Sequence, residues 1–114
     1  MLEIVSPLTG ERLIIAANDF ENKMDWFQAK RACDELGNGW RLPSLNELLN
    51  ILKEGQKNGK GNFKKGYYWS NTEHGSDSDH VSLVCFGETI EQTILPKSIP
   101  EVKIYHYVRA VKAV

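Results

Sequence analysis

The segment from Glu73 to His80 carries side chains that could hold a metal ion. Glu73, Asp77 and Asp79 lie there together with His74 and His80. Carboxylate oxygens are the ligands that Ca²⁺ prefers, so one interpretation of the three acidic residues is a calcium site. The regular aspartate spacing of the common calcium-binding loop is missing, however, and a pair of histidines is a weak zinc signal without further ligands. We favour a solvated acidic loop and expect no bound metal or cofactor.

A lysine-rich segment before Tyr67 could contact an acidic glycan or another polyanion. Residues 54–66 are rich in lysine and glycine, and we expect them to form a mobile basic loop. Tyr67 could stack on a sugar ring or could simply begin the next strand. A solvated face, offset by the nearby acidic loop, is the alternative that we favour. The candidate ligand-binding residues of this segment are Lys57, Lys60, Lys64, Lys65 and Tyr67.

Either of two cysteines could supply a nucleophile. Cys33 or Cys85 would need one of the three histidines of the chain as its base. Cys33 lies on the apolar face of a predicted helix, which predicts a raised pKa and an unreactive thiol. Neither cysteine lies in a glycine-rich or electropositive turn, so we expect no catalytic residue. We favour two buried thiols, and the sequence leaves open whether they form a disulfide.

A further group could bind an anion. It consists of Arg41, Glu47 and Arg109 with Trp40 and Trp69. The alternative is an Arg–Glu pair that ties a corner between two helices to the last strand, with Arg41 directed across the corner. Because buried charges require partners, we favour this structural pair and interpret Arg109 as a clamp rather than a ligand residue.

Two predicted helices must position these residues. The first carries an apolar stripe at helical spacing. It starts at a capping box of Asp25 and Gln28 and ends before Gly37. Its stripe consists of Trp26, Ala29, Cys33 and Leu36.

The second helix lies within "NGWRLPSLNELLNIL". Pro43 holds Leu42 extended, so this helix cannot begin before Ser44. Ser44 and Glu47 form a second capping box. We expect Trp40 and Leu42 to pack inward at the corner between the helices, which makes this stretch scaffold. The buried face of the helix consists of Leu45, Leu48, Leu49 and Leu52.

Strands are expected at both ends of the chain, with a loop-rich region between them. "SPLTGER" predicts a turn between strands near Glu3–Val5 and Arg12–Ala17. "YYWSNT" and the alternating "VSLVCF" predict two more strands, and Gly87 then turns the chain. We expect an irregular crossing at "LPKSIPE" and a final strand at "IYHYVRAVKAV". Two early helices with flanking strands indicate an α+β fold.

Length and charge exclude several classes of protein. A chain of 114 residues is expected to form one domain, residues 1–114. Lys and Arg total 14 against 15 Asp and Glu, so no net field attracts nucleic acid. No apolar run is long enough to span a membrane, and no signal peptide is visible. As written, the sequence is expected to be cytoplasmic, or cell-surface or secreted if a leader was removed.

Three stretches, "DWFQAKRACDELGNGWRLPSLNELLNIL", "YYWSNT" and "YVRAVK", together resemble the Lcl C-terminal domain family, a largely uncharacterised family of bacterial domains. The resemblance runs from about Trp26 to the C-terminus. The start of the second helix, R-L-P-x-x-x-E, is also distantly similar to formylglycine-generating enzymes and other C-type-lectin-like folds. The matching residues are Trp26, Ala29, Cys33, Trp40, Arg41, Leu42, Pro43, Glu47, Leu48, Tyr68, Trp69, Ser70, Val108, Arg109 and Val111.

The resemblance implies a compact C-type-lectin-like domain, with two helices packed on a small, mostly antiparallel sheet, adjacent termini and long loops on one face. The three expected loops are Glu54–Gly66, Thr72–His80 and Glu91–Tyr105. Many family members carry a cysteine where this chain has Ala110, so the disulfide usual in the family is absent. The sequence also lacks the signatures of sugar-binding C-type lectins and the late cysteine pair of the formylglycine-generating enzymes.

We therefore expect a non-catalytic recognition module that binds a glycan or a protein surface through its loops. Some relatives in the family are linked to binding of sulfated glycans. Two alternatives stay open. One is a small enzyme derived from the same fold that uses a thiol or a loop-bound metal, and the other is a structural module that forms a homo-oligomer.

Overall fold

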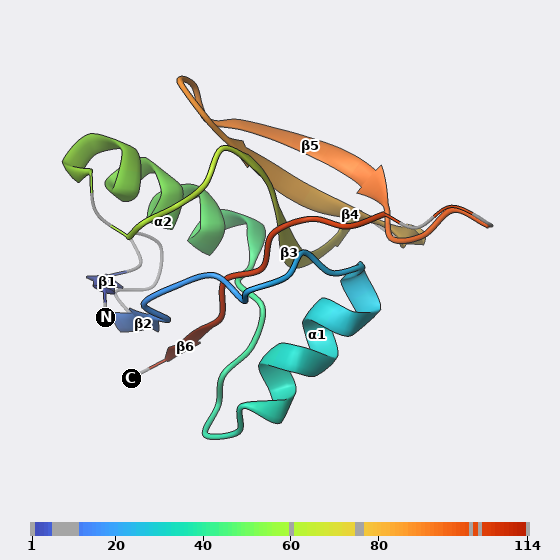
Figure 1. Cartoon of the computed structure of the whole chain (residues 1–114), viewed down its shortest axis with the longest axis horizontal. Coiled ribbons are helices and arrows are strands. Elements are labelled where there is room, and N and C mark those ends of the chain that lie inside the picture. The colour runs from blue at the N-terminus through green and yellow to red at the C-terminus, as the bar shows by residue number, and fades with distance from the viewer. Residues whose placement is uncertain are drawn as a thin grey trace.

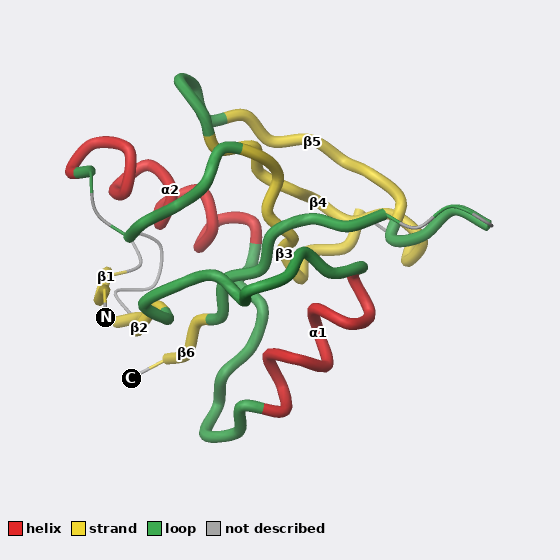
Figure 2. Tube along the Cα trace, viewed as in Figure 1, coloured by secondary structure: helices red, strands yellow, loops and turns green. Residues whose placement is uncertain are grey.

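The computed structural model describes residues 2–5, 12–59, 61–74, 77–100, 102 and 104–113. Along the chain, two helices follow the first two strands and precede the remaining strands (Figure 1), and long irregular connections link the elements (Figure 2). Along the chain the elements are β1 (Leu2–Val5), β2 (Arg12–Ile15), α1 (Trp26–Glu35), α2 (Leu45–Asn58), β3 (Gly66–His74), β4 (Asp77–Phe86), β5 (Glu91–Pro96) and β6 (Val111–Ala113).

The strands form two antiparallel sheets rather than the one small sheet expected. Their strand orders are β1-β2-β6 and β3-β4-β5. The predicted final strand is divided between them, since Tyr107 bridges to Tyr68 of β3 while Val111 pairs with Ile15 of β2. The chain crosses from one sheet to the other, so only Val111–Ala113 remains regular strand. Both β1 and β6 pair with β2, which brings the two ends of the described chain together.

The central part of the β3–β4 pair is buried on both faces. Successive residues of a strand point to opposite faces, and the neighbours Tyr68 and Trp69 are both fully buried, in different clusters. Trp69 packs with Trp26 of α1, whereas Tyr68 packs with Leu48 of α2. The two helices therefore cover opposite faces, which explains why the whole run Val81–Val84 of β4 is buried.

Both predicted capping boxes are present. Asp25 accepts a hydrogen bond from the backbone N–H of Gln28, and Ser44 accepts one from that of Glu47. The prediction that Leu36 belongs to the buried stripe is wrong, because Leu36 is 47% exposed. It forms the C-cap of α1, after the last full turn, where the helix no longer directs it into the core.

The second helix is longer than expected and replaces the first part of the predicted basic loop. α2 continues to Asn58 because Ile51 and Gly55 extend its buried face. It ends at Gly59, whose φ of 64° is the left-handed conformation that favours glycine. Neither α1 nor α2, in the part of the chain that the structure describes, is long and apolar enough to cross a membrane.

Two other predicted loops also contain strands. The segment Thr72–His80 consists largely of the ends of β3 and β4, with register shifts beside Glu73. Much of the third loop, Glu91–Pro96, is β5. These strand segments were not predicted because their residues are polar and show no apolar pattern. Backbone pairing, of β3 with β4 and of β4 with β5, stabilises them instead. In the N-terminal hairpin β2 ends at Ile15, and the predicted turn lies outside the described residues.

Candidate functional site

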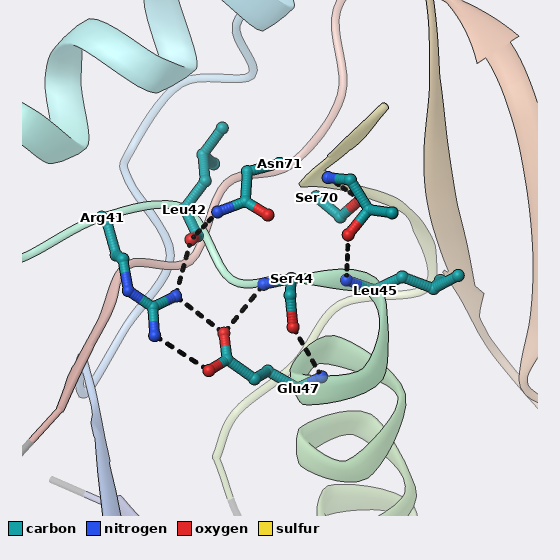
Figure 3. A network of polar contacts seen from close by, with 8 residues as sticks. Arg41, Leu42, Ser44, Leu45, Glu47, Ser70 and Asn71 are labelled. Atoms are coloured by element: carbon teal, nitrogen blue, oxygen red, sulfur yellow. Dashed lines mark hydrogen bonds and ion pairs between the residues drawn. The ribbon is translucent and has the colours of Figure 1, made fainter. Parts of the chain in front are cut away.

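One glutamate holds the corner between the two helices (Figure 3). Glu47 accepts hydrogen bonds from both terminal nitrogens of Arg41, at 2.7 and 2.8 Å, and from the backbone N–H of Ser44 at 2.8 Å. Burial alone would raise the pKa of Glu47, but hydrogen bonds from Arg41 and Ser44 and the charge of Arg41 outweigh burial and lower it. The carboxylate therefore stays charged and fixes the first turn of α2.

The same corner is joined to both sheets. Arg41 exchanges two backbone hydrogen bonds with Val111 at the start of β6. On the other side, Asn71 of β3 donates its backbone N–H to the carbonyl of Pro43 at 2.8 Å, and its side chain donates to the carbonyl of Leu42 at 3.2 Å. These contacts tie the start of α2 to β3 and to β6.

Arg109 is paired with Asp19 and not with Glu47. Its Nε donates to Asp19 at 2.8 Å, and both side chains are buried, with 0% and 2% exposed. The other nitrogens donate to the carbonyls of Ala16 at 3.1 Å and Asn62 at 3.3 Å, and the guanidinium lies 4.3 Å from the ring centroid of Phe63. Arg109 therefore joins the segments before α1 and after α2 to the end of the chain.

The tryptophans also serve the scaffold. The indole N–H of Trp26 donates to the carbonyl of Ser70 at 2.9 Å. That of Trp69 donates to the carbonyl of Met24 at 2.7 Å. Trp40 is half-buried against the cluster that contains both of them. The rings of Trp26 and Trp69 therefore fill the core while their indole N–H groups are hydrogen-bonded.

The predicted acidic and basic segments lie at opposite ends of β3. A nine-residue strand runs from Gly66 to His74, which is a length of about 26 Å. Glu73 is at the far end of this strand, whereas Lys64 and Tyr67 are at its start. The structure therefore does not bring the predicted ligand-binding residues into one site.

A buried lysine engages the acidic end of β3. The ammonium group of Lys97 lies 3.4 Å from the carboxylate of Glu73 and 4.0 Å from the ring centroid of Trp26, with 8% of its side chain exposed. Its backbone N–H donates to the carbonyl of Asp79 at 2.8 Å. The side chain of Asp77 lies outside the described residues. Among the residues that are described, no group of three or more His, Cys, Asp or Glu side chains could hold a metal ion.

The basic end gathers lysine and tyrosine side chains into what we call the lysine–tyrosine surface, which also includes one histidine. Lys23 and Lys64 lie 4.7 and 6.0 Å from the ring centroid of Tyr107. The ring of His106 lies 5.5 Å from that of Tyr67, which is 39% exposed. Tyr107 packs on the face of Tyr68, whereas Tyr67 and His106 lie on the opposite face, with Trp69. The lysine–tyrosine surface therefore extends over both faces at this end of β3 and consists of Lys23, Lys64, Tyr67, His106 and Tyr107.

Backbone pairing holds these residues in place. Met24, next to Lys23, exchanges hydrogen bonds with His106 at 3.0 Å in both directions. Tyr107 donates its backbone N–H to the carbonyl of Tyr67 at 3.0 Å, which sets the segment beside β3. Gly66 permits this approach, because a Cβ atom there would come within 2.8 Å of the Tyr107 ring.

The remaining predicted lysines contribute less. Lys57 lies in the last turn of α2, where a positive charge stabilises the helix end. Lys65 is exposed beside Lys64, and Lys60 lies outside the described residues.

Burial, and then the positive charge of Lys23, lower the pKa of His106, so its ring is neutral at neutral pH.

The two cysteines are free thiols in different environments. Cys33 is fully buried, and its pKa is raised to about 12, first by burial and then by the carboxylate of Asp34. Because the thiolate is the nucleophile, Cys33 is unreactive at neutral pH. Cys85 is partly exposed on β4.

This difference predicts the outcome of thiol modification. A small disulfide reagent at pH 7.5 is expected to modify Cys85 in the native protein, and Cys33 only after unfolding. The reagent releases one absorbing thiolate for each cysteine that it modifies. The absorbance of this product therefore gives the number of modified cysteines with and without denaturant. The variant Cys85→Ser serves as the control and should show no reaction before unfolding. Rapid modification of native Cys85→Ser would contradict the buried, protonated state of Cys33.

This structure is similar to solved structures of other proteins. The structure resembles the crystal structure of EMS16, an antagonist of the collagen receptor integrin α2β1 (GPIa/IIa), with a TM-score of 0.61 and 13% sequence identity. The match covers 91% of this chain and 92% of that one. No family model matches the chain, and no curated protein matches it. The predicted α+β, C-type-lectin-like fold is confirmed.

Proposed function

We propose that this chain is a non-catalytic recognition domain of the Lcl C-terminal type, which binds an acidic glycan at the lysine–tyrosine surface. The observation that carries the proposal is the placement of Lys23 and Lys64 near the ring of sequence-distant Tyr107, with the exposed ring of Tyr67 on the other face of the same strand pair. Membership of the family is supported by the ordered motifs around Trp40, Trp69 and Arg109.

The chemistry of this surface suits a sugar that carries sulfate or carboxylate groups. Two ammonium groups can each contact an anionic group of the glycan, in a region where His106 stays neutral and adds no charge. An exposed tyrosine ring offers an apolar face for a sugar ring and a hydroxyl group for hydrogen bonding. Because Lys23 and Lys64 stand beside backbone fixed to β3, little order has to be gained on binding.

Buried Cys33 supports the non-catalytic part of the proposal. Because the thiol of Cys33 is protonated and enclosed by the core, the alternative of an enzyme that uses a thiol or a loop-bound metal is left with Cys85 or the metal. The carboxylate of Glu73, one of the metal candidates, already faces Lys97. A recognition role needs neither group.

A protein partner is the second candidate. The side chains of Phe27, Ile99 and Val102 are 54%, 44% and 54% exposed, and exposed apolar groups of this size are common at protein contacts. EMS16, which has the same fold, is described as an antagonist of an integrin receptor. That likeness supports protein recognition as a use of this architecture without identifying a partner.

Thermal unfolding with a sulfated oligosaccharide tests the glycan proposal. Ligand at a hundred times its dissociation constant adds about 2.7 kcal/mol to the free energy of unfolding. We expect a salt-sensitive rise in Tm with sulfated glycan and none with its neutral counterpart. The double variant Lys23→Ala/Lys64→Ala should bind about tenfold more weakly, since each exposed contact contributes up to ~1 kcal/mol.

The matched control is Lys53→Ala, which removes an exposed lysine of α2 that is not among the residues of the lysine–tyrosine surface. This variant should bind like the wild type. Equal losses in the control and the double variant would point to nonspecific charge attraction, and absence of any Tm shift with sulfated glycan would leave the protein-partner candidate.

A further inference from the structure

The strand β5 forms an open edge of its sheet. It is the outer strand in the order β3-β4-β5 and pairs with β4 alone within the described chain (Figure 1). The lysine–tyrosine surface lies beyond β3, at the opposite edge, because residues 106 and 107 pair with β3 and Met24. The two edges are therefore independent.

Hydrogen bonding fixes which residues of β5 face outward. The backbone N–H of Lys97 donates to the carbonyl of Asp79, which continues the register in which Pro96 lies opposite His80. Backbone groups alternate in direction along a strand. Since Lys97 is directed toward β4, the outward positions are Gln92, Ile94 and Pro96. Proline has no N–H to leave unpaired, so an outward edge position is where it is tolerated.

An apolar side chain lies at the middle of this edge. Ile94 is 44% exposed and is flanked by the outward positions Gln92 and Pro96. An uncovered edge with an exposed apolar residue is a surface to which another strand can add. We propose that β5 pairs in antiparallel fashion with β5 of a second copy of this chain, around a two-fold axis at Ile94.

This pairing is self-complementary. Ile94 lies opposite the partner's Ile94, and the two exchange backbone hydrogen bonds. Gln92 lies opposite the partner's Pro96, whose carbonyl accepts the N–H of Gln92 and which has no N–H to satisfy. One residue further out, Glu91 lies opposite the partner's Lys97, whose side chain is buried against Glu73 and Trp26 of its own chain, so no two carboxylates face each other there. In a register centred on Thr93, the polar side chain of Gln92 would instead lie opposite the apolar side chain of the partner's Ile94.

The expected dimer is weak. A pairing limited to a six-residue strand buries less than the ~1,600 Å² of a standard interface. Association should therefore depend on protein concentration. It would place two lysine–tyrosine surfaces on one particle, although the proposed pairing does not depend on glycan binding.

Sedimentation velocity across a concentration series tests this inference. We expect the sedimentation coefficient of the wild type to rise from the monomer value toward that of a dimer. In Ile94→Lys two like charges would meet at the axis, so association should weaken at least tenfold. The matched control is Ile99→Lys, because Ile99 has the same exposed fraction, 44%, but lies beyond β5. The control should associate like the wild type.

Several outcomes would overturn the inference. A wild type that stays monomeric up to millimolar concentration excludes the dimer, and equal association of Ile94→Lys and wild type places the contact elsewhere. A second variant, Ile94→Cys, tests the register without using charge repulsion. It should form a disulfide-linked dimer under oxidation, because the Cα atoms of a hydrogen-bonded antiparallel pair are about 5.5 Å apart, a separation that a disulfide can bridge. Linkage no faster than in the wild type would also reject the register.

Discussion

Replacing Arg109 with alanine is expected to lower the free energy of unfolding by about 3–5 kcal/mol, because it leaves the buried carboxylate of Asp19 without its cation. The same change removes hydrogen bonds to the carbonyls of Ala16 and Asn62 and the contact with the Phe63 ring. Tyr68, whose hydroxyl donates to Asp19 at 2.7 Å, would remain as a polar partner of that carboxylate. Urea unfolding followed by tryptophan fluorescence measures the loss.

The matched control is an ion pair on the surface. Lys30 and Asp34 lie 3.3 Å apart on α1, with 55% and 52% of their side chains exposed. Removing Lys30 should change the free energy of unfolding by no more than about 0.5 kcal/mol. If the free energy of unfolding of Arg109→Ala lay within about 1 kcal/mol of the wild-type value, the loss would be no larger than that of an exposed ion pair. Arg109 would then not act as a clamp.

Replacing Glu47 with alanine is expected to cost about 2–4 kcal/mol, since it removes both the Glu47 half of the capping box of α2 and the partner of Arg41. The same side chain accepts from two nitrogens of Arg41 and from the N–H of Ser44. Chemical unfolding at pH 7 measures the effect. Glu54→Ala is the control, because Glu54 lies in the same helix and is exposed. A Glu47→Ala loss no larger than that of the control would contradict the role of this residue.

The contribution of Glu47 should also depend on pH in a fixed direction. Its pKa in the folded protein is below the ordinary value of 4.5. The unfolded chain therefore binds the proton more readily, and folding gains stability from the ionised form above about pH 4.5. That gain is lost as the pH falls through the folded pKa. The difference in stability between wild type and Glu47→Gln should accordingly shrink below pH 4.5, whereas a constant difference would contradict the lowered pKa.

Local parts of the fold could be predicted from the sequence. The capping boxes at Asp25 and Ser44 involve residues three positions apart, so the chain itself brings their partners together. The start of α2 after Pro43 follows from sterics in the same way. The end of α2 could not be predicted, because the buried position of Gly55 depends on packing rather than on a local signal.

Long-range pairs could not be predicted. Asp19 is separated by 90 positions from Arg109 and is one of 15 acidic residues, so no spacing distinguishes it. Lys97 lies in a proline-containing segment that was expected to be an irregular crossing, and its burial against Trp26 has no sequence signal. Lys23 and Tyr107 were missed for the same reason, since their contact requires the final segment to lie beside β3.

The proposed binding surface depends on such a long-range arrangement. Lys64 and Tyr67 were candidates from sequence, but the predicted loop did not include Lys23, His106 or Tyr107. The structure also separates the acidic candidates, represented by Glu73, from the basic ones by the length of β3. A ligand at the basic end would thus leave the acidic end untouched, and this separation can be measured.

Amide NMR spectra recorded during titration with a sulfated oligosaccharide would test the proposed site most directly. We expect the largest shifts at Lys23, from Lys64 to Tyr67, and at His106 and Tyr107, with little change at Glu73 and Lys97. The shifts should saturate with one dissociation constant and weaken at higher salt concentration. Saturable shifts centred on Glu73 and Lys97 instead, or no shifts at all, would contradict glycan recognition by the lysine–tyrosine surface.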